Sequence, residues 1–279
     1  MSRLRAVLIH AVLIVACAAA LYPVLWVFKI ALTPSQAFDS DPFPLPRVFS
    51  LQNFRDVVLA HDRLGQWLFG RQLLNSLLVS TAVALLGVAL ATTAAYALSR
   101  FRFPGRGYTL RAFMLTQMFP GVLTTIPLYV ILEKAHLLDS LIGLSLCYAA
   151  TSIPFSVFML KGFFDSLPID LEEAARLDGC TQFQIFWHIS LPLARPALAI
   201  TALFSFLTAW NEFILAATFL NDPGKYTLPI LLNRYVGDYA TEWGHFAAGA
   251  IVVSAPVVAL FYALQRHLVG GLSAGGVKG

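Results

Sequence analysis

The chain has 279 residues, of which 58% are hydrophobic and only 12% are charged, and its formal net charge is +4. Because soluble domains carry about one quarter charged residues, this composition is that of a membrane protein. The basic residues lie between apolar stretches and form no single patch, which argues against nucleic-acid binding and indicates signals for membrane topology.

Six apolar runs follow one another along the chain, and each is long enough for a bilayer-crossing helix, which needs about 20 residues. They span residues 6–28, 73–99, 112–132, 140–164, 196–220 and 244–264. For the first run the alternative is a cleaved signal peptide, since the residues just before Cys17 loosely resemble a lipoprotein cleavage site. However, the run continues past Cys17, and a cleaved apolar region is only about 7–15 residues long, so we expect an uncleaved span.

Local composition predicts two further features, a short helix between the first two apolar runs and a kink within the third run. The polar segment at residues 29–72 contains an expected short helix at residues 51–59. The third apolar run holds Pro120 and Pro127, which remove backbone donors, so this span should be kinked.

Arginines beside the third run decide the predicted topology. Arg100, Arg102, Arg106 and Arg111 stand within about twelve residues, and the positive-inside rule places such a short basic loop in the cytoplasm. With six spans, both termini are then cytoplasmic. Over the whole chain this topology places eleven Lys and Arg inside and eight outside, which is only weak agreement. Most of the outer ones, however, belong to one long loop, where the positive-inside rule is less strict.

A polar stretch at residues 170–192 separates the fourth and fifth runs, and this topology puts it in the cytoplasm. Its spacing predicts a helix, a tight turn and a second short helix. Asp170 and Glu173 are spaced as a capping box at the start of the first helix. Gly179 stands where a left-handed residue would end that helix.

The second short helix is predicted to start from Thr181, with Gln184 three residues later as another capping box. Pro192 should end or kink the helical segment beyond it. On the first helix, Glu172 and Arg176 are spaced as an i,i+4 ion pair, which would fix how a docking partner sits. Taken alone, the stretch fits equally well a capped loop that merely joins two spans.

No catalytic or metal-binding pattern is present in the sequence. Cys17, Cys147 and Cys180 are far apart, and none of the six histidines has a His or Cys partner at ligand spacing. The sequence contains no phosphate-binding Gly-rich loop with Lys-Ser/Thr, no HExxH and no nucleophile elbow. We therefore expect no catalytic residues, no metal and no ATP hydrolysis by this chain.

Polar side chains inside the apolar runs are candidates either for a transport pathway or for seams between helices: Asn211, Glu212, Gln117, Tyr148 and Ser152. Glu212 is the most informative, because a carboxylate in the bilayer costs roughly 2.5–3.5 kcal/mol on insertion scales and normally faces a cavity or a partner. The alternative for Glu212 is a structural hydrogen bond to a neighbouring helix.

The polar stretch resembles the EAA loop of binding-protein-dependent ABC importer permeases. The resemblance rests on Glu173-Ala174-Ala175, Gly179 after three residues, Ile189 after nine more, and Leu191-Pro192. In that family this loop is a cytoplasmic coupling helix that docks into a groove of the ATPase subunit. The resemblance implies that coupling is carried by Glu172, Glu173, Ala174, Ala175, Asp178, Gly179, Ile189, Leu191 and Pro192.

Nearly the whole chain resembles the MalG-like branch of the carbohydrate permeases. The similar segments are residues 75–106, 117–121, 126–129, 210–213, 243–250 and the tail 271–279. Ser273 is a mild departure in the tail. The pair Asn211-Glu212 is closer to the broader family than to the best-known maltose members, which leaves maltose specificity open.

The resemblance implies an all-α membrane protein with six transmembrane helices in the type I ABC importer permease fold, including a cytoplasmic EAA coupling helix. It implies an N-terminal helix and outer loop at residues 1–72, a permease domain at 73–265 and a cytoplasmic tail at 266–279. The expected location is the bacterial cytoplasmic (inner) membrane.

The implied partners are a second permease subunit (MalF-like), a dimer of ATPase subunits (MalK-like) that binds ATP and Mg, an extracytoplasmic sugar-binding protein and membrane lipid. The chain itself should bind no cofactor and no nucleic acid. The expected cargo is maltose or maltodextrin, with trehalose or another oligosaccharide as the alternative. The rival functions are a gradient-driven secondary transporter or channel and an intramembrane enzyme, although the spans hold no paired catalytic set for the latter.

Overall fold

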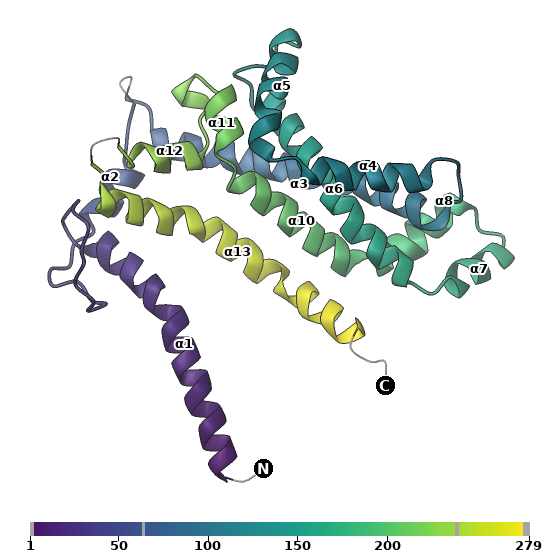
Figure 1. The fold of residues 1–279 in the computed structure, drawn as a ribbon, viewed down its shortest axis with the longest axis horizontal. Coiled ribbons are helices and arrows are strands. Elements are labelled where there is room, and N and C mark those ends of the chain that lie inside the picture. The colour runs from purple at the N-terminus through teal and green to yellow at the C-terminus, as the bar shows by residue number, and fades with distance from the viewer. Residues whose placement is uncertain (1–2, 63–64, 238–239, 276–279) are drawn as a thin grey trace. The chain divides into compact units, whose positions relative to one another are not determined.

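A computed structural model describes residues 3–62, 65–237 and 240–275, and this part of the chain is helical, with no strand beyond two isolated bridges. Figure 1 labels its helices. In chain order they are α1 (Arg3–Leu32), α2 (Gln52–Val58), α3 (Leu68–Arg100), α4 (Arg106–Met118), α5 (Gly121–Lys134), α6 (Leu141–Ser166), α7 (Asp170–Leu177), α8 (Gln182–Ile185), the π-helical turn η1 (Phe186–Ser190), α9 (Leu191–Leu193), α10 (Arg195–Trp210), α11 (Ile214–Phe219), the 3₁₀ turn η2 (Pro223–Lys225), α12 (Leu228–Arg234) and α13 (Trp243–Gly275).

Within the described residues, four helices are long and apolar enough to cross a membrane: α1, α3, α6 and α13. Two further helix pairs pass the same test only together, because each is bent. The pair α4 and α5 is bent by 103°, and the segment Gln182–Leu193 is bent by 74° against α10. By length and composition the described residues thus hold four candidate spans, or up to six if each bent pair forms one span.

The third and fifth apolar runs are not continuous helices. In the third, the break falls at Phe119 and Pro120, where the sequence predicted a kink. The fifth run, at residues 196–220, is interrupted as well, because α10 ends at Trp210 and α11 begins at Ile214. Hydropathy alone cannot reveal such a break, since the residues on both sides of it are apolar.

The chain forms two compact units, residues 1–73 with 230–255 and residues 74–229 with 256–279. In the first unit, the last turn of α1 is held by polar contacts. The buried Lys29 ammonium lies 2.8 Å from Asp39 Oδ2 and donates to the carbonyl of Asp41 at 2.7 Å. The Asn53 amide of α2 donates to the carbonyls of Ala31 and Thr33 at 3.1 and 2.8 Å. The bond to Ala31 satisfies a carbonyl in the last turn of α1, where the helix itself supplies no donor.

The core of the second unit is built where α3, α6 and α10 meet. Small residues permit the close approach: a Cβ on Gly87 would lie 3.4 Å from Ser152 Oγ, and Ser156 Oγ lies 3.2 Å from Ser205 Oγ. Close packing of small residues with hydroxyl contacts is the usual way in which membrane helices associate.

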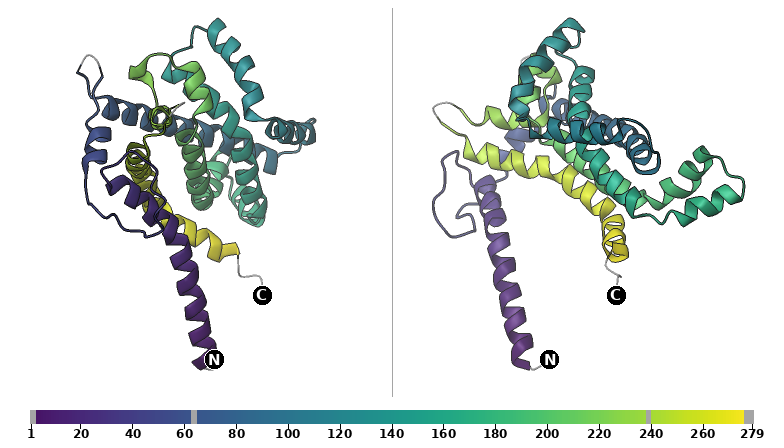
Figure 2. Two further views of the ribbon diagram at one scale, coloured as in Figure 1. Left: turned by 60° about the vertical axis from the view of Figure 1, so that its left-hand side comes forward. Right: turned by 45° about the vertical axis from the view of Figure 1, so that its right-hand side comes forward.

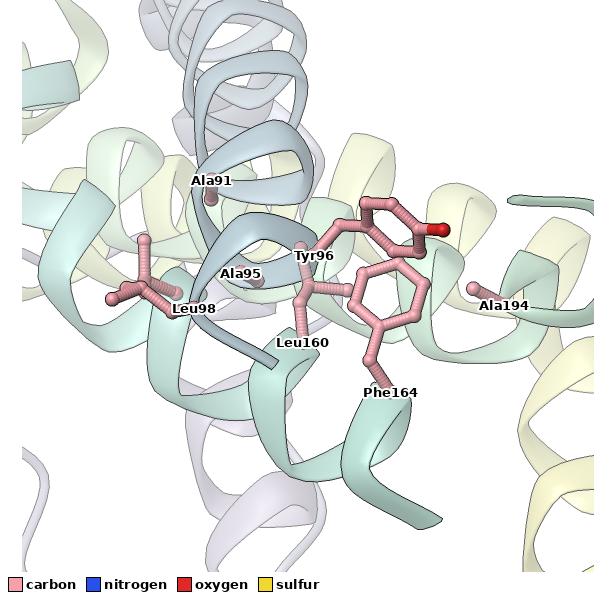
Figure 3. Close-up of a cluster of buried hydrophobic side chains, with 8 residues drawn as sticks. Ala91, Ala95, Tyr96, Leu98, Leu160, Phe164 and Ala194 are labelled. Atoms are coloured by element: carbon pink, nitrogen blue, oxygen red, sulfur yellow. The ribbon is translucent and has the colours of Figure 1, made fainter. Parts of the chain in front are cut away.

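A buried apolar cluster continues this core toward the end of α3. It joins residues of α3 and α6 to Ala194, which lies at the bend before α10. Figure 3 shows the rings of Tyr96 and Phe164 next to each other, with the Tyr96 hydroxyl directed out of the cluster. The cluster therefore fixes the position of a polar group at its edge.

At the other end of the second unit, hydrogen bonds join the loop between α5 and α6 to the loop that follows α11. Asp139, which follows α5, accepts from the backbone N–H of Asn221 and Asp222 at 2.9 and 3.0 Å. Its other oxygen lies 2.6 Å from Lys225 Nζ. Burial by itself would raise the pKa of Asp139, but these hydrogen bonds outweigh it and lower the pKa below its usual value.

Candidate functional site

Helix α7 and the short helix α8 lie at one end of the second unit, away from α5 and α11, as Figure 1 and the right-hand view of Figure 2 show. Gly179 ends α7 with a φ of 87°. Its N–H donates to the carbonyl of Arg176 at 3.1 Å, and the N–H of Cys180 donates to that of Ala175 at 3.0 Å. This pair of bonds is a Schellman motif, so the predicted left-handed turn is confirmed.

The predicted capping box of Asp170 and Glu173 is wrong. The residue before α7 is Ile169, whose φ of −67° and ψ of −26° are already helical, and no side chain caps this end. Asp170 therefore lies inside the first turn together with Glu172 and Glu173. Acidic residues still stabilise that turn through the helix dipole.

The second capping box is confirmed, and it starts the segment that leads into α10. The N–H of Gln184 donates to Thr181 Oγ1 at 3.3 Å, and the N–H of Thr181 donates to Gln184 Oε1 at 2.8 Å. The π-helical turn η1 holds Ile189, and α9 holds Leu191 and Pro192, with all three side chains half-buried. The chain then bends at Ala194, two residues after Pro192.

Glu172 is buried, with its side chain 3% exposed, and is not on the outer face of α7. Its Oε1 accepts from Arg100 Nε and from Ser190 Oγ, both at 2.8 Å. The predicted pair with Arg176 is present only as a longer contact of 3.8 Å. The close ion pair is with Arg100, at the end of α3, whose side chain is 7% exposed.

Further hydrogen bonds extend this ion pair into a network. Tyr96 donates to Glu172 Oε2 at 3.3 Å, and the Gln182 amide donates to Tyr96 Oη at 2.6 Å. Arg100 Nη2 also donates to the carbonyl of Leu167, which ends α6, at 3.3 Å. The network ties the polar stretch at residues 170–192 to α3 and α6. A buried charge pair of this kind is stable only when its remaining polar atoms are also satisfied.

The side of α7 away from Glu172 is exposed. Ala175 is buried, whereas Glu173, Ala174, Asp178 and Gly179 are exposed. Two large apolar side chains lie open nearby: Leu177 is 89% exposed and Phe183 is 71% exposed. An exposed apolar surface edged by acidic groups is typical of a protein-docking surface.

The candidate polar residues of the spans separate into two groups. Tyr148 and Ser152 are buried in α6, and the Tyr148 hydroxyl donates to Glu212 Oε2. Glu212 also accepts from the backbone N–H of Leu215 and Ala216 at 2.9–3.2 Å, so it caps α11. These contacts explain how a carboxylate is accommodated there.

Asn211 and Gln117, in contrast, are both exposed. The Asn211 amide donates to the carbonyl of Leu207 at 2.9 Å, within the last turn of α10. Gln117 lines a cavity between α4, α5 and α6. In the part of the chain that the structure describes, no group of three or more His, Cys, Asp or Glu side chains is placed to hold a metal ion.

Comparison with known families identifies the chain. The family model for the binding-protein-dependent transport system inner membrane component matches residues 83–273. The chain belongs to this permease family. The match includes the whole of the polar stretch at residues 170–192.

Relatives of this permease carry sugars of different kinds. The diacetylchitobiose uptake permease DasC of Streptomyces coelicolor is 35% identical over 92% of each chain. The maltose/maltodextrin permease MalG of Vibrio parahaemolyticus is 42% identical over 74% of this chain and 71% of that protein. In fold, the permease is similar to a chain in the crystal structure of a bacterial ABC transporter that is involved in the import of the acidic polysaccharide alginate. There the TM-score is 0.76 at 23% identity, covering 95% of this chain and 98% of that one.

Sequence reasoning missed the partners of Glu172 in this permease. The sequence marks Arg100 only as a topology signal, and it does not single out Tyr96, Gln182 or Ser190. Arg100 and Glu172 are 72 residues apart, so no local spacing joins them. The available signal was a basic cluster and an acidic cluster on the same predicted side of the membrane, which does not say which residues pair.

Proposed function

We propose that this permease is the membrane subunit of an ATP-driven oligosaccharide importer and that α7 is its coupling helix. The observation that carries the proposal is the buried ion pair of Glu172 with Arg100. It anchors a short helix, exposed on its other side, directly to the end of a long apolar helix. A helix fixed in this way is suited to transmit the movement of a docked protein to the membrane domain.

The proposed docking partner is a dimer of ATPase subunits, which binds ATP and Mg. Glu173, Ala174, Asp178 and Gly179 lie on the exposed side of the polar stretch and would meet the ATPase. Ile189, Leu191 and Pro192 would pass its movement on, because they precede the bend at Ala194. Closure of the ATPase dimer then shifts the membrane helices between two packed arrangements, which gives alternating access.

The proposed arrangement in the membrane is six spans, with α4–α5 and the segment from α8 to α10 each counted as one broken span. Both termini and α7 are then in the cytoplasm. Residues 1–72 form an N-terminal helix and outer loop, residues 73–265 the permease domain and residues 266–279 a cytoplasmic tail. A second permease subunit completes the pathway, and a sugar-loaded binding protein docks from outside.

The cargo is proposed as a neutral oligosaccharide, with maltose or maltodextrin favoured. The support is the 42% identity with a maltose/maltodextrin permease, against 35% over a longer stretch with a diacetylchitobiose permease. Trehalose is a further choice. No observation favours a gradient-driven transporter, because Glu212 already uses its carboxylate as a helix cap and as a link to Tyr148.

The decisive experiment is reconstitution of this chain in proteoliposomes with its companion permease and ATPase. Binding proteins loaded with maltose, trehalose or diacetylchitobiose are then added outside. We expect one loaded binding protein to stimulate ATP hydrolysis and sugar uptake together. Hydrolysis that ignores every binding protein, or uptake that needs an ion gradient and no ATP, would overturn the proposal.

A further inference from the structure

The break between α4 and α5 opens onto a cavity of about 470 Å³, which the two helices share with α6. Its volume lies within the range of ~300–1,000 Å³ that is usual for small-molecule sites. The residues of interest on its wall are Phe113, Thr116, Gln117, Phe119, Thr124 and Thr151. The cavity is separate from α7, and the coupling role proposed for α7 does not involve it.

The cavity lies at mid-depth of its helices. Thr151 follows the first residue of α6 by ten residues and precedes the last by 15, which corresponds to about 15 and 22 Å along the axis. The break at Phe119 and Pro120 follows the 13 residues of α4, or about 20 Å of helix. In membrane transporters, substrate sites lie near the bilayer midplane, where a span is discontinuous.

The polar groups on the wall are arranged to accept hydrogen bonds. The hydroxyls of Thr116, Thr124 and Thr151 donate to carbonyls of their own helices, at 2.7, 2.7 and 2.9 Å, so their oxygens still have lone pairs for an incoming donor. Gln117 donates its amide to the carbonyl of Thr151 at 3.3 Å, which leaves its side-chain oxygen as an acceptor.

The chemistry of the wall favours an uncharged ligand with many hydroxyls. No charged side chain is found among the described residues that line the cavity. Phe113 and Phe119 add aromatic surface on which the C–H face of a sugar ring can pack. Thr116, Gln117 and Thr151 are exposed, and such groups in a bilayer normally face an aqueous path or another helix.

We propose that this cavity is a sugar-contacting subsite of the transport pathway, in which Gln117, Thr116 and Thr151 hydrogen-bond a pyranose ring that stacks on Phe113 or Phe119. The inference rests on the proposed function as a sugar importer and deepens it, because it places substrate contact on this subunit. A helix of the companion permease and a lipid chain are the other occupants that the test must separate.

The first test uses the reconstituted importer and the sugar that the wild type transports. We expect Gln117→Ala and Thr151→Val each to lower the uptake rate by about 2–10-fold, the loss expected for one hydrogen bond. Stimulation of ATP hydrolysis by the loaded binding protein should stay unchanged. The matched control is Thr93→Val, an exposed threonine of α3 outside this cavity. Wild-type uptake for both variants would overturn the subsite and leave the proposed function standing, whereas failure of the wild type to take up any sugar removes both.

The second test detects water and sugar in the cavity directly. Thr151→Cys is made in a chain with Cys17 and Cys180 replaced by serine and is treated in the assembled importer with a small water-soluble thiol reagent. We expect labelling that slows when the transported sugar is trapped in the pathway, and no such protection at Thr93→Cys. Absence of labelling would overturn the proposal in favour of a covering helix or lipid, as would labelling that sugar leaves unaffected.

Discussion

At the scale of single residues, the pair of Glu172 and Arg100 has the strictest requirements. Both side chains are almost fully buried, so neither charge can be solvated if the other is removed. Loss of one partner of a buried ion pair costs about 3–5 kcal/mol, whereas replacing both by apolar residues is often neutral. If Arg100 is removed, the hydrogen bonds from Ser190 and Tyr96 offset only part of the cost of the buried Glu172 charge, because neither of these groups is charged.

We therefore expect Arg100→Met to lower the thermal stability of the assembled transporter and its uptake per ATP hydrolysed. Adding Glu172→Met to it should recover much of the stability. Unfolding of the purified complex, followed by tryptophan fluorescence, measures the first effect. Arg102→Met is the control, because Arg102 is exposed two residues further on. Equal losses from the two arginine variants would show that the ion pair does not hold α7.

Asp139 gives a prediction about pH. Hydrogen bonds from Lys225 and the backbone hold its pKa below the usual value, so the folded state favours the ionised carboxylate. The resulting stabilisation is complete above the unfolded pKa of about 3.9 and is lost as the pH falls through the lower, folded value. Asp139→Asn should thus melt below the wild type at pH 7, and the gap should close in acid.

Melting curves between pH 7 and pH 3 measure that gap, with Asp178→Asn, at an exposed position, as the comparison. A gap for Asp139→Asn that stays constant down to pH 3 would contradict the assignment of its partners.

At the scale of elements, the end of α7 depends on a backbone conformation. Gly179 has a φ of 87°, and a Cβ there would meet no atom within 4 Å, so the cost of substitution is conformational and not steric. A left-handed residue other than glycine costs roughly 1–2 kcal/mol, and asparagine costs less than a β-branched residue. Proline, with φ fixed near −65°, cannot form this turn.

The expected order of uptake per ATP hydrolysed is therefore wild type, then Gly179→Asn, then Gly179→Val, with Gly179→Pro uncoupled although still present in the membrane. Parallel assays of sugar uptake and ATP hydrolysis in proteoliposomes give the order. Normal coupling by a well-expressed Gly179→Pro variant would falsify the role of this turn.

What the sequence predicted about the elements depends on the range of each interaction. The turn at Gly179 and the capping box at Thr181 involve residues three to five apart, so local spacing was enough to find them. The predicted start of α7, with Asp170 as its cap, was wrong because Ile169 already has helical dihedrals. The conformation of Ile169 depends on how α6 ends, which local spacing does not reveal. The break at residues 211–213 was not predicted, because the sequence does not distinguish a glutamate that caps a helix, as Glu212 does, from any other polar residue in a span.

At the scale of the whole molecule, the six apolar runs predicted helices in the right places, while the bends within them depend on contacts between helices. The partners of Glu172 come from α3 and η1, far away in the chain, and only folding brings them together. The orientation in the membrane is a separate question, since it depends on the distribution of charge outside the spans.

Orientation is tested by thiol labelling in intact cells with a reagent that does not cross membranes. In the six-span arrangement, Cys180 after α7 is cytoplasmic and Asn221 after α11 is external, and both positions are exposed. We expect a chain whose Cys17 is replaced by serine to be labelled at Cys180 only after the membrane is permeabilised. Asn221→Cys, with Cys180 also replaced, should be labelled in intact cells. Because the two positions lie on either side of the broken segment from α8 to α11, equal labelling of both in intact cells would mean that this segment re-enters on one side and does not span.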